Sequence, residues 1–170
     1  KPADGVALET ENGYRKVMEN VVSLSYDRDT GFAVDKDGKA WFWGDAVSEM
    51  WVPFNYEDIP SSYTKTGVWG TSVVEPYNFM DNVKQILRHG ATYILTSDGD
   101  LCAVGDNINC ALGIGNEDQT YYSKDPLFVT DNVEEILCSG DHNFVIKTDG
   151  SLWGWGTIEV RVDGFNSSAP

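Results

Sequence analysis

Apolar residues in this chain occur in short runs separated by turn residues, and no long window keeps them at helical spacing. Residues 143–147 are rich in β-branched and aromatic side chains, and a second apolar run at 152–155 follows the pair Asp149-Gly150. Asp-Gly between two such runs is typical of a β-hairpin, because both residues tolerate the positive φ of tight primed turns. The pattern therefore predicts two antiparallel strands joined by a primed turn.

The same hairpin pattern occurs three times. Its turn glycines, Gly38, Gly99 and Gly150, lie 61 and 51 residues apart. Each is followed six residues later by a second glycine, at Gly44, Gly105 and Gly156. An acidic residue and an Asn-Val pair precede each hairpin, at Asn20, Asn82 and Asn132. Repeats of this length indicate solenoids, propellers or arrays.

The Asn-Val pairs open one further apolar run in each unit. These runs predict short strands over 21–24, 83–87 and 133–137. Helix at 82–87 and 132–137 is the alternative, because these two segments are the least clearly alternating. We otherwise expect little helix.

Several spaced positions resemble the repeat of the regulator of chromosome condensation family. That repeat runs Gly-Gly-x-His-x-x-Ala-Leu, then Asp-Gly, Leu-x-x-Trp-Gly, Asn and Gly-Gln-Leu-Gly. The third unit matches it at Gly140, His142, Asp149, Gly150, Leu152, Trp155 and Gly156. The second matches at Asp98, Gly99, Leu101, Gly105, Asn107, Leu112, Gly113 and Gly115, and the first at Asp37, Gly38, Trp43 and Gly44. The resemblance covers residues 15–157.

The resemblance implies an all-β fold of β-propeller blades, each made of antiparallel strands, with about three repeats in this chain. We assign 1–14 to an N-terminal extension and 15–170 to the repeat domain, with units near 15–76, 77–126 and 127–165. Three units do not close a ring of the seven blades usual in that family. The chain is then a fragment of a longer propeller, an open set of blades, or a protomer that completes its blades by self-association. The alternating segment 157–163 predicts an edge strand at the end of the last blade.

The net charge of the chain limits the classes of partner that it can bind. The 170 residues are 41% apolar and 12% aromatic, and 27 acidic residues against 12 basic ones give a net charge of −15. Such a surface repels a phosphate backbone, so we expect no nucleic-acid partner. No apolar run reaches the length of a membrane span. Low basic content and degenerate repeats favour an extracellular or cell-surface location, whereas free thiols would suit the cytoplasm.

Residues for catalysis or metal binding are sparse. Cys102, Cys110 and Cys138 have no ligand spacing, and the two histidines, His89 and His142, accompany no nucleophile motif. The Asp27/Asp29 and Asp35/Asp37 pairs lack the glutamate that closes a calcium loop. The glycine-rich segment 105–116 lacks the Lys-Ser/Thr of a phosphate loop. We therefore expect no catalytic residue, no metal and no cofactor.

The strongest candidate site is a long connection in the first unit. It holds 37 residues between Gly44 and Asn82, against 26 between Gly105 and Asn132. Five of its aromatic residues form the candidate partner-binding set: Trp51, Phe54, Tyr56, Tyr63 and Trp69. Long loops on a rigid scaffold commonly carry binding surfaces. The alternative is that these aromatics fold inward and pack the blade.

The tryptophan-rich strand 152–155 is a second candidate. Trp153 and Trp155 are two residues apart and so share one face, and we assign both to packing within the blade.

These observations predict a non-enzymatic repeat module that binds a protein, with carbohydrate as the alternative ligand class. An acidic rim would favour basic partners. The resemblance adds a second hypothesis, a guanine-nucleotide-exchange regulator of a small GTPase. A third is an accessory domain of a larger secreted enzyme.

Overall fold

The computed structural model describes residues 10–11, 14–27, 30–45, 52–67, 70–139, 142–157, 159–162 and 165–168. Within these ranges the chain forms β-strands and short 3-10 helices, and no α-helix. The all-β, propeller-type fold predicted from the sequence is confirmed. The segments 83–87 and 133–137 are strands, so helix there is excluded.

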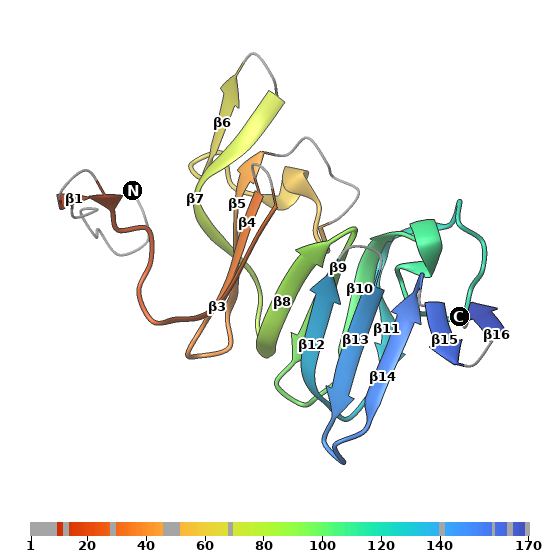
Figure 1. Ribbon diagram of the computed structural model, residues 1–170. Helices are drawn as coiled ribbons and strands as arrows, with labels where there is room; N and C mark the ends of the chain where they lie inside the picture. Colours follow the sequence, from red (N-terminus) through yellow and green to blue (C-terminus); the bar gives the residue numbers. More distant parts are fainter. Residues whose placement is uncertain are drawn as a thin grey trace.

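Three antiparallel sheets follow one another along the chain (Figure 1). The first has the order β3-β4-β5-β7-β6, the second β11-β10-β9-β8 and the third β12-β13-β14. In the first sheet the strands are β3 (Val21–Asp27), β4 (Thr30–Asp35), β5 (Ala40–Asp45), β6 (Thr64–Gly67) and β7 (Gly70–Met80). In the second they are β8 (Val83–His89), β9 (Ala91–Thr96), β10 (Leu101–Asp106) and β11 (Tyr122–Thr130), and in the third β12 (Val133–Ser139), β13 (His142–Lys147) and β14 (Leu152–Gly156).

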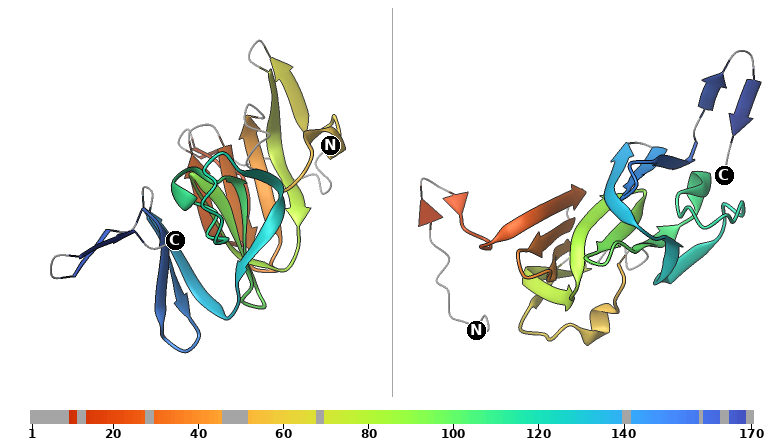
Figure 2. Two further views of the ribbon diagram at one scale, coloured as in Figure 1. Left: turned by 90° about the vertical axis from the view of Figure 1, so that its right-hand side faces the viewer. Right: turned by 90° about the horizontal axis from the view of Figure 1, so that it is seen from below.

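We call the first strand of each sheet, β3, β8 or β12, its inner strand. The inner strands of successive sheets contact one another. Strand β8 packs against β3 on one side and β12 on the other (Figure 1). This arrangement stacks each sheet face to face on the next, as propeller blades stack. Two short ribbons lie at opposite ends of the molecule (Figure 2). They pair β1 (Thr10–Glu11) with β2 (Tyr14–Arg15), and β15 (Glu159–Val162) with β16 (Phe165–Ser168).

The last ribbon corrects one prediction. Residues 159–162 are a strand, as the alternation in 157–163 indicates, but β15 pairs with β16 rather than with the edge of the third sheet. A two-stranded ribbon satisfies the same alternating pattern because one face of each strand can point to solvent. Alternation gives a strand's faces and not its neighbour.

The hairpins are confirmed, but their turns are not the predicted primed turns. Val34 pairs with Ala40, and the backbone N–H of Asp35 donates to the Lys39 carbonyl, so three residues form the connection. Only its last residue, Gly38, has a positive φ, at 76°. A two-residue type I′ turn needs positive φ at both central residues, whereas a three-residue loop needs it only at the last. The same geometry recurs at Gly99 and Gly150, with φ of 91° and 82°.

The asparagine of each Asn-Val pair also has a left-handed backbone. Asn20, Asn82 and Asn132 have φ of 57°, 62° and 56°. Their carbonyls accept hydrogen bonds of 2.8–3.0 Å from the first residue of the turn in the same blade, Lys36, Ser97 or Thr148. Asparagine tolerates this conformation better than other residues with a Cβ. The sequence repeats Asn here because the chain must reverse tightly before each inner strand.

In the second and third blades, the valine that follows this asparagine joins the blade to the previous one. The backbone N–H of Val83 donates to the carbonyl of Gly38 at 2.9 Å, and that of Val133 donates to the carbonyl of Gly99 at 2.9 Å. The turn of each blade is therefore hydrogen-bonded to the start of the next. Two blade-to-blade seams of the same construction result.

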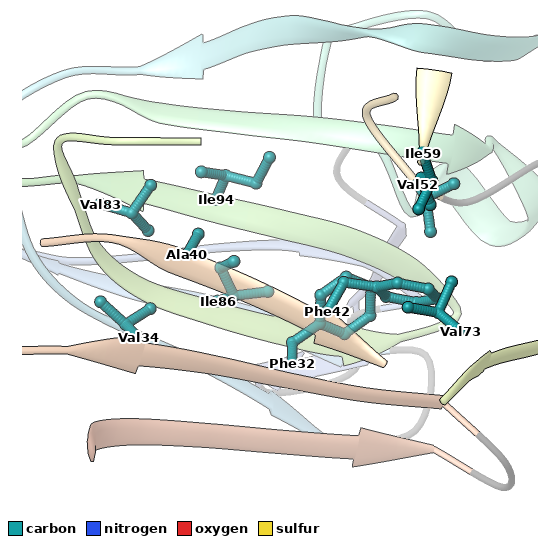
Figure 3. Packing of buried hydrophobic residues seen from close by; sticks show 10 residues of the cluster. All are labelled: Phe32, Val34, Ala40, Phe42, Val52, Ile59, Val73, Val83, Ile86 and Ile94. Carbon is teal, nitrogen blue, oxygen red and sulfur yellow. The ribbon is translucent and has the colours of Figure 1, made fainter. Parts of the chain in front are cut away.

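Two hydrophobic clusters fill these seams. The first combines Phe32 and Phe42 of the first blade with Ile86 and Ile94 of the second, all fully buried (Figure 3). The second combines side chains of the second blade with Val133, Ile136, Val145 and Trp155 of the third. Each buried side chain of this size contributes about 1.5–3 kcal/mol. The core thus lies between blades rather than inside any one of them.

The left-handed asparagines give a test of this account. Asn132→Ala should lower the free energy of unfolding by about 1 kcal/mol, because a left-handed backbone is strained for alanine. Asn132→Gly should stay within about 0.5 kcal/mol of the parent, because glycine adopts positive φ freely. Urea denaturation of the three proteins measures the difference. Equal stabilities for the two variants would mean that the backbone at this residue is not left-handed in solution.

Candidate functional site

The long connection of the first unit builds an extension on the outer side of the first blade. Strand β7 has 11 residues and pairs with both β5 and β6. The β6–β7 hairpin projects past the rest of the sheet (Figure 1). Residues 52–54 and a 3-10 helix, Tyr56–Asp58, precede this hairpin. We call residues 52–67 and 70–74 the first-blade extension.

Two aliphatic residues anchor the extension to the core. Val52 is 3% exposed and Ile59 is 6% exposed, and both belong to the cluster between the first and second blades. Figure 3 shows them together at one end of that cluster. The segment between them is therefore fixed at both ends. Such anchoring holds the attached surface in one position.

Aromatic rings form the base of the extension. The ring of Phe54 lies 5.1 Å from that of Phe42 and 5.0 Å from that of Phe79, between centroids. Tyr63 contacts Tyr77 edge to face, with centroids 5.6 Å apart. Contacts of this kind add about 0.5–1.5 kcal/mol beyond burial. Phe54 and Tyr63 therefore pack inward, half-buried against the core.

The other three residues of the candidate set are less fully placed. Trp51 and Trp69 lie outside the described residues, and for Tyr56 only the backbone, in the 3-10 helix, is described. The partner-binding role of all five aromatics stays a prediction. For Phe54 and Tyr63, the observed packing is the contact that the alternative interpretation expects.

Polar groups make up much of the exposed surface of the extension. Glu57 and Asp58 are exposed side by side in the 3-10 helix, and Asn55 donates a long hydrogen bond of 3.5 Å to Asp58. Across the hairpin, the hydroxyls of Thr66 and Thr71 lie 3.2 Å apart. This surface can offer charge and hydrogen bonds to a partner. Sequence reasoning missed the acidic pair, because only its place beside the anchored loop distinguishes it from other surface carboxylates.

The reactive side chains in the described chain include two histidines and three free cysteines. His89 and His142 are both exposed and lie on different blades, His89 on the inner strand β8 and His142 on the middle strand β13. Burial raises the pKa of the Cys138 thiol to about 12, and burial followed by the nearby Asp100 raises that of Cys102. Such thiols are protonated at neutral pH and are poor nucleophiles.

No group of three or more metal-ligating side chains occurs among the described residues. Asp35, one of the aspartates with calcium-like spacing, accepts hydrogen bonds from the Trp41 indole and from the N–H groups of Asp37 and Lys39. Partial burial raises its pKa, but these bonds outweigh burial and leave the pKa below its usual value. No helix in the described part of the chain is long and apolar enough to cross a membrane.

The residues that carried the family resemblance hold the second blade together. Asn107 is fully buried, its side-chain oxygen accepts from the Leu112 N–H, and its amide donates to the carbonyls of Asn116 and Asp118. Leu112 is fully buried beneath this loop. Asn107 therefore closes the loop that follows β10, and Leu112 packs in the core beneath that loop. They are structural rather than partner-binding residues.

The two tryptophans of the last strand differ from each other. Trp155 is 7% exposed and its indole N–H donates to the carbonyl of Ala111 at 2.8 Å, as blade packing predicts. Trp153 is 59% exposed, and the assignment of this residue to blade packing is wrong. Its indole donates to the Ser151 hydroxyl, and the Lys147 ammonium lies 5.7 Å from its ring centroid. By register, Trp153 lies on the same sheet face as Val145 and Trp155, which packs on the second blade, but at a point that the second blade leaves exposed.

Comparisons with known proteins place this fold. No protein-family model matches the sequence. Over 156 residues, 84% of this chain, the sequence is 25% identical to Protein pim1 of Schizosaccharomyces pombe, and the match spans 28% of that protein. The crystal structure of human WBSCR16 matches with a TM-score of 0.64 and 14% identity, over 94% of this chain and 40% of that one.

A second solved structure has a similar fold. Prp20p from Saccharomyces cerevisiae matches with a TM-score of 0.56 and 20% identity, over 86% of this chain and 35% of that one. Prp20 is the yeast RCC1 protein, and its structure was described with its binding to Gsp1p and histones. This chain spans less than half the length of each of these three proteins. In its fold, the chain is a set of three successive β-propeller blades similar to parts of the WBSCR16 and Prp20p structures.

Proposed function

We propose that this chain is a non-enzymatic module that binds a protein through the first-blade extension. The observation that supports this proposal is the β6–β7 hairpin, which projects beyond the sheet while Val52 and Ile59 fix its base in the core. A projecting element on a rigid base can enter a partner's surface with little loss of conformational entropy. The connection between β5 and β7, which contains this hairpin, is longer than any other connection between strands in the described chain.

Two tryptophans would supply the apolar anchors. Gly67 pairs with Gly70 across the hairpin, and Trp69 stands between them in the sequence. Trp51 directly precedes the buried Val52. Tryptophan is enriched among the residues that dominate binding energy at interfaces. Phe54 and Tyr63 form the aromatic base of the extension.

Charge favours a basic partner. The net charge is −15, and Glu57 and Asp58 are exposed beside the hairpin. Complementary charge accelerates encounter and suppresses wrong partners more than it adds affinity. Histones are basic proteins, and Prp20p binds them. This chain is then expected to bind histones or proteins of similar charge.

Regulation of a GTPase is the second candidate, because Prp20p also binds Gsp1p. The present chain spans 35% of that protein, so the shared part would need to hold the exchange surface by itself. Acceleration of labelled-nucleotide release from Gsp1p would favour this function over simple binding. A carbohydrate ligand would use the same tryptophans by ring stacking, and competition with soluble oligosaccharides separates it from a protein ligand.

The tryptophan anchors give the first test. The double variant Trp51→Ala, Trp69→Ala should weaken binding to core histones or Gsp1p by at least about a hundredfold, since each anchor contributes about 2 kcal/mol. Its free energy of unfolding should match the parent. Biolayer interferometry and urea denaturation measure the two quantities.

Trp153→Ala is the matched control, because Trp153 is an exposed tryptophan on a different blade. It should bind as the parent does. If the double variant unfolds instead, Trp51 and Trp69 belong to the core and the proposed site is wrong.

The acidic pair gives a separate test. The double variant Glu57→Lys, Asp58→Lys should weaken histone binding about tenfold near 0.1 M salt, and the loss should shrink as added salt screens the charges. Glu117→Lys, Asp125→Lys makes the same charge change on an exposed part of the second blade and should have a smaller effect. Equal effects of the two double variants would show that only net charge matters and that the extension is not the contact surface.

A further inference from the structure

The side chains that the inner strands turn toward one another differ between the two seams. Ser25 pairs with Phe32 in the first blade, and Leu87 pairs with Tyr93 at the corresponding place in the second. Phe32 belongs to the cluster of the first seam and Tyr93 to that of the second. Because paired residues share a sheet face, Ser25 and Leu87 each face the blade that follows.

Arg88 and Cys138 occupy the matching position on the opposite side of each seam. Arg88 comes two residues after Ile86, and Cys138 comes two residues after Ile136. Residues two apart on a strand share a face, and each isoleucine is buried in the cluster that its blade forms with the preceding one. Arg88 and Cys138 therefore face the blade that precedes them.

At the first seam this position is polar. The backbone N–H of Arg88 donates to the Ser25 hydroxyl at 2.9 Å. The Arg88 guanidinium lies 3.8 Å from the Asp27 carboxylate, between Nη2 and Oδ2. The side chain of Arg88 is 6% exposed, whereas that of Asp27 is 40% exposed. A cation is thus buried between the first two blades beside a carboxylate. We call Ser25, Asp27 and Arg88 the charge key.

At the second seam the same position is apolar. Leu87 and Cys138 are half-buried, and both pack against the hydrophobic cluster between the second and third blades. Burial raises the pKa of the Cys138 thiol to about 12, so this side chain is uncharged at neutral pH. By register, the exposed His89 stands in the second blade where Asp27 stands in the first.

The main contacts of the two seams are otherwise alike. Val83 and Val133 make the same backbone hydrogen bond to the preceding blade, at 2.9 Å each. Ile86 and Ile136 fill equivalent places in the two clusters. Proteins built from similar units can misassemble by docking a unit on the wrong neighbour, including one in another copy. A wrong seam between these blades would keep the valine and isoleucine contacts.

We propose that the charge key fixes the order of the first two blades by excluding wrong docking. If the second blade docked on the second blade of another copy, Arg88 would be buried against Leu87, with His89 in place of the carboxylate. A buried charge without its partner costs far more than a paired one gains. The charge key therefore contributes specificity rather than net stability, as repulsive elements do at specific interfaces.

Removing the cation tests this proposal directly. Arg88→Met keeps a long side chain and removes the charge, so docking on Leu87 becomes favourable. After refolding from urea at matched concentration, the fraction of dimers and larger species should be at least about threefold that of the parent. Size exclusion coupled to light scattering measures this fraction. The species should persist on dilution, because blades exchanged between copies separate only when the chain unfolds.

Two single variants serve as controls. Asp27→Asn leaves Arg88 charged, so it should lower the urea midpoint but refold with the same dimer fraction as the parent. Lys84→Met removes a cation from the same inner strand, where the ammonium lies 3.9 Å from the Glu134 carboxylate and the lysine side chain is 44% exposed. This variant should also keep the dimer fraction of the parent.

The proposal fails if Arg88→Met refolds with the dimer fraction of the parent, or if either control raises that fraction as much. It also fails if the additional species dissociate on dilution. An unfolded Arg88→Met chain would overturn it as well, since the cation would then be needed for the fold itself.

Moving the charge key to the second seam is an independent test. Cys138→Arg buries a cation opposite Leu87 and should lower the urea midpoint. Adding His89→Asp places a carboxylate at the position of Asp27 and should restore part of that loss. His89→Asp alone should change the midpoint little, because this side chain is exposed. A double variant no more stable than Cys138→Arg would show that the position does not distinguish paired from unpaired cations, and would overturn the proposal.

Discussion

The backbone hydrogen bond between a valine N–H and the turn glycine of the preceding blade is the contact on which this architecture depends. It occurs twice, from Val83 to Gly38 and from Val133 to Gly99, at 2.9 Å each time. The turn must place its carbonyl outward, which the positive φ of the glycine permits, and the chain must reverse at the asparagine before the valine. With both conditions met, the apolar residues that follow fall into the seam. Local turn chemistry thereby sets the spacing of one blade from the next.

This construction leaves the outer strands free to vary. The seam uses the inner strand, the turn and one sheet face, so a longer connection between β5 and β7 does not disturb it. The first-blade extension exploits that freedom, and Val52 and Ile59 tie it back to the same core that joins two blades. Stability and a variable surface are therefore assigned to different parts of each unit. Function is best sought where the unit departs from its repeat.

Much of the fold could be predicted from the sequence because its signals are local. Asp-Gly, Asn-Val and the closing glycine each mark a backbone conformation, and they occur at fixed offsets that reveal three hairpins and three inner strands. The turn type was predicted wrongly, because Asp-Gly occurs both in two-residue primed turns and at the end of three-residue loops whose last residue has a positive φ. The partner of 159–162 was missed because alternation identifies faces and not neighbours. Trp153 shares its sheet face with the buried Trp155, so its exposure depends on how far the second blade extends over that face, which the spacing of the strand residues does not encode.

The candidate site was less predictable for a related reason. A run of aromatics in a long loop has no period, so nothing local separates rings that pack inward from rings that face a partner. Phe54 and Tyr63 pack because Phe42, Tyr77 and Phe79 come from strands that the sequence pairs only after folding. The exposed Glu57 and Asp58 become notable only once the loop is seen to be anchored. Side-chain direction in a connection is thus decided by tertiary contacts.

Packing at the edges of the blades explains why the repeats look degenerate. Trp43 stands across from Gly31, where any Cβ would collide with its indole. The equivalent Trp155 faces Asn143 on its own sheet and lies over Gly113 of the previous blade, where a Cβ would be 2.7 Å from its Nε1. The second blade pairs the smaller Val104 with Thr92. In the first and third blades a large tryptophan packs over a glycine, whereas in the second blade two side chains of intermediate size face each other. The summed side-chain volume at the position changes little, because protein interiors are close-packed. Side chains at equivalent positions can therefore change together while the backbone hydrogen bonds between blades stay the same. For that reason the turn residues mark the repeat in this chain more reliably than the aromatic residues do.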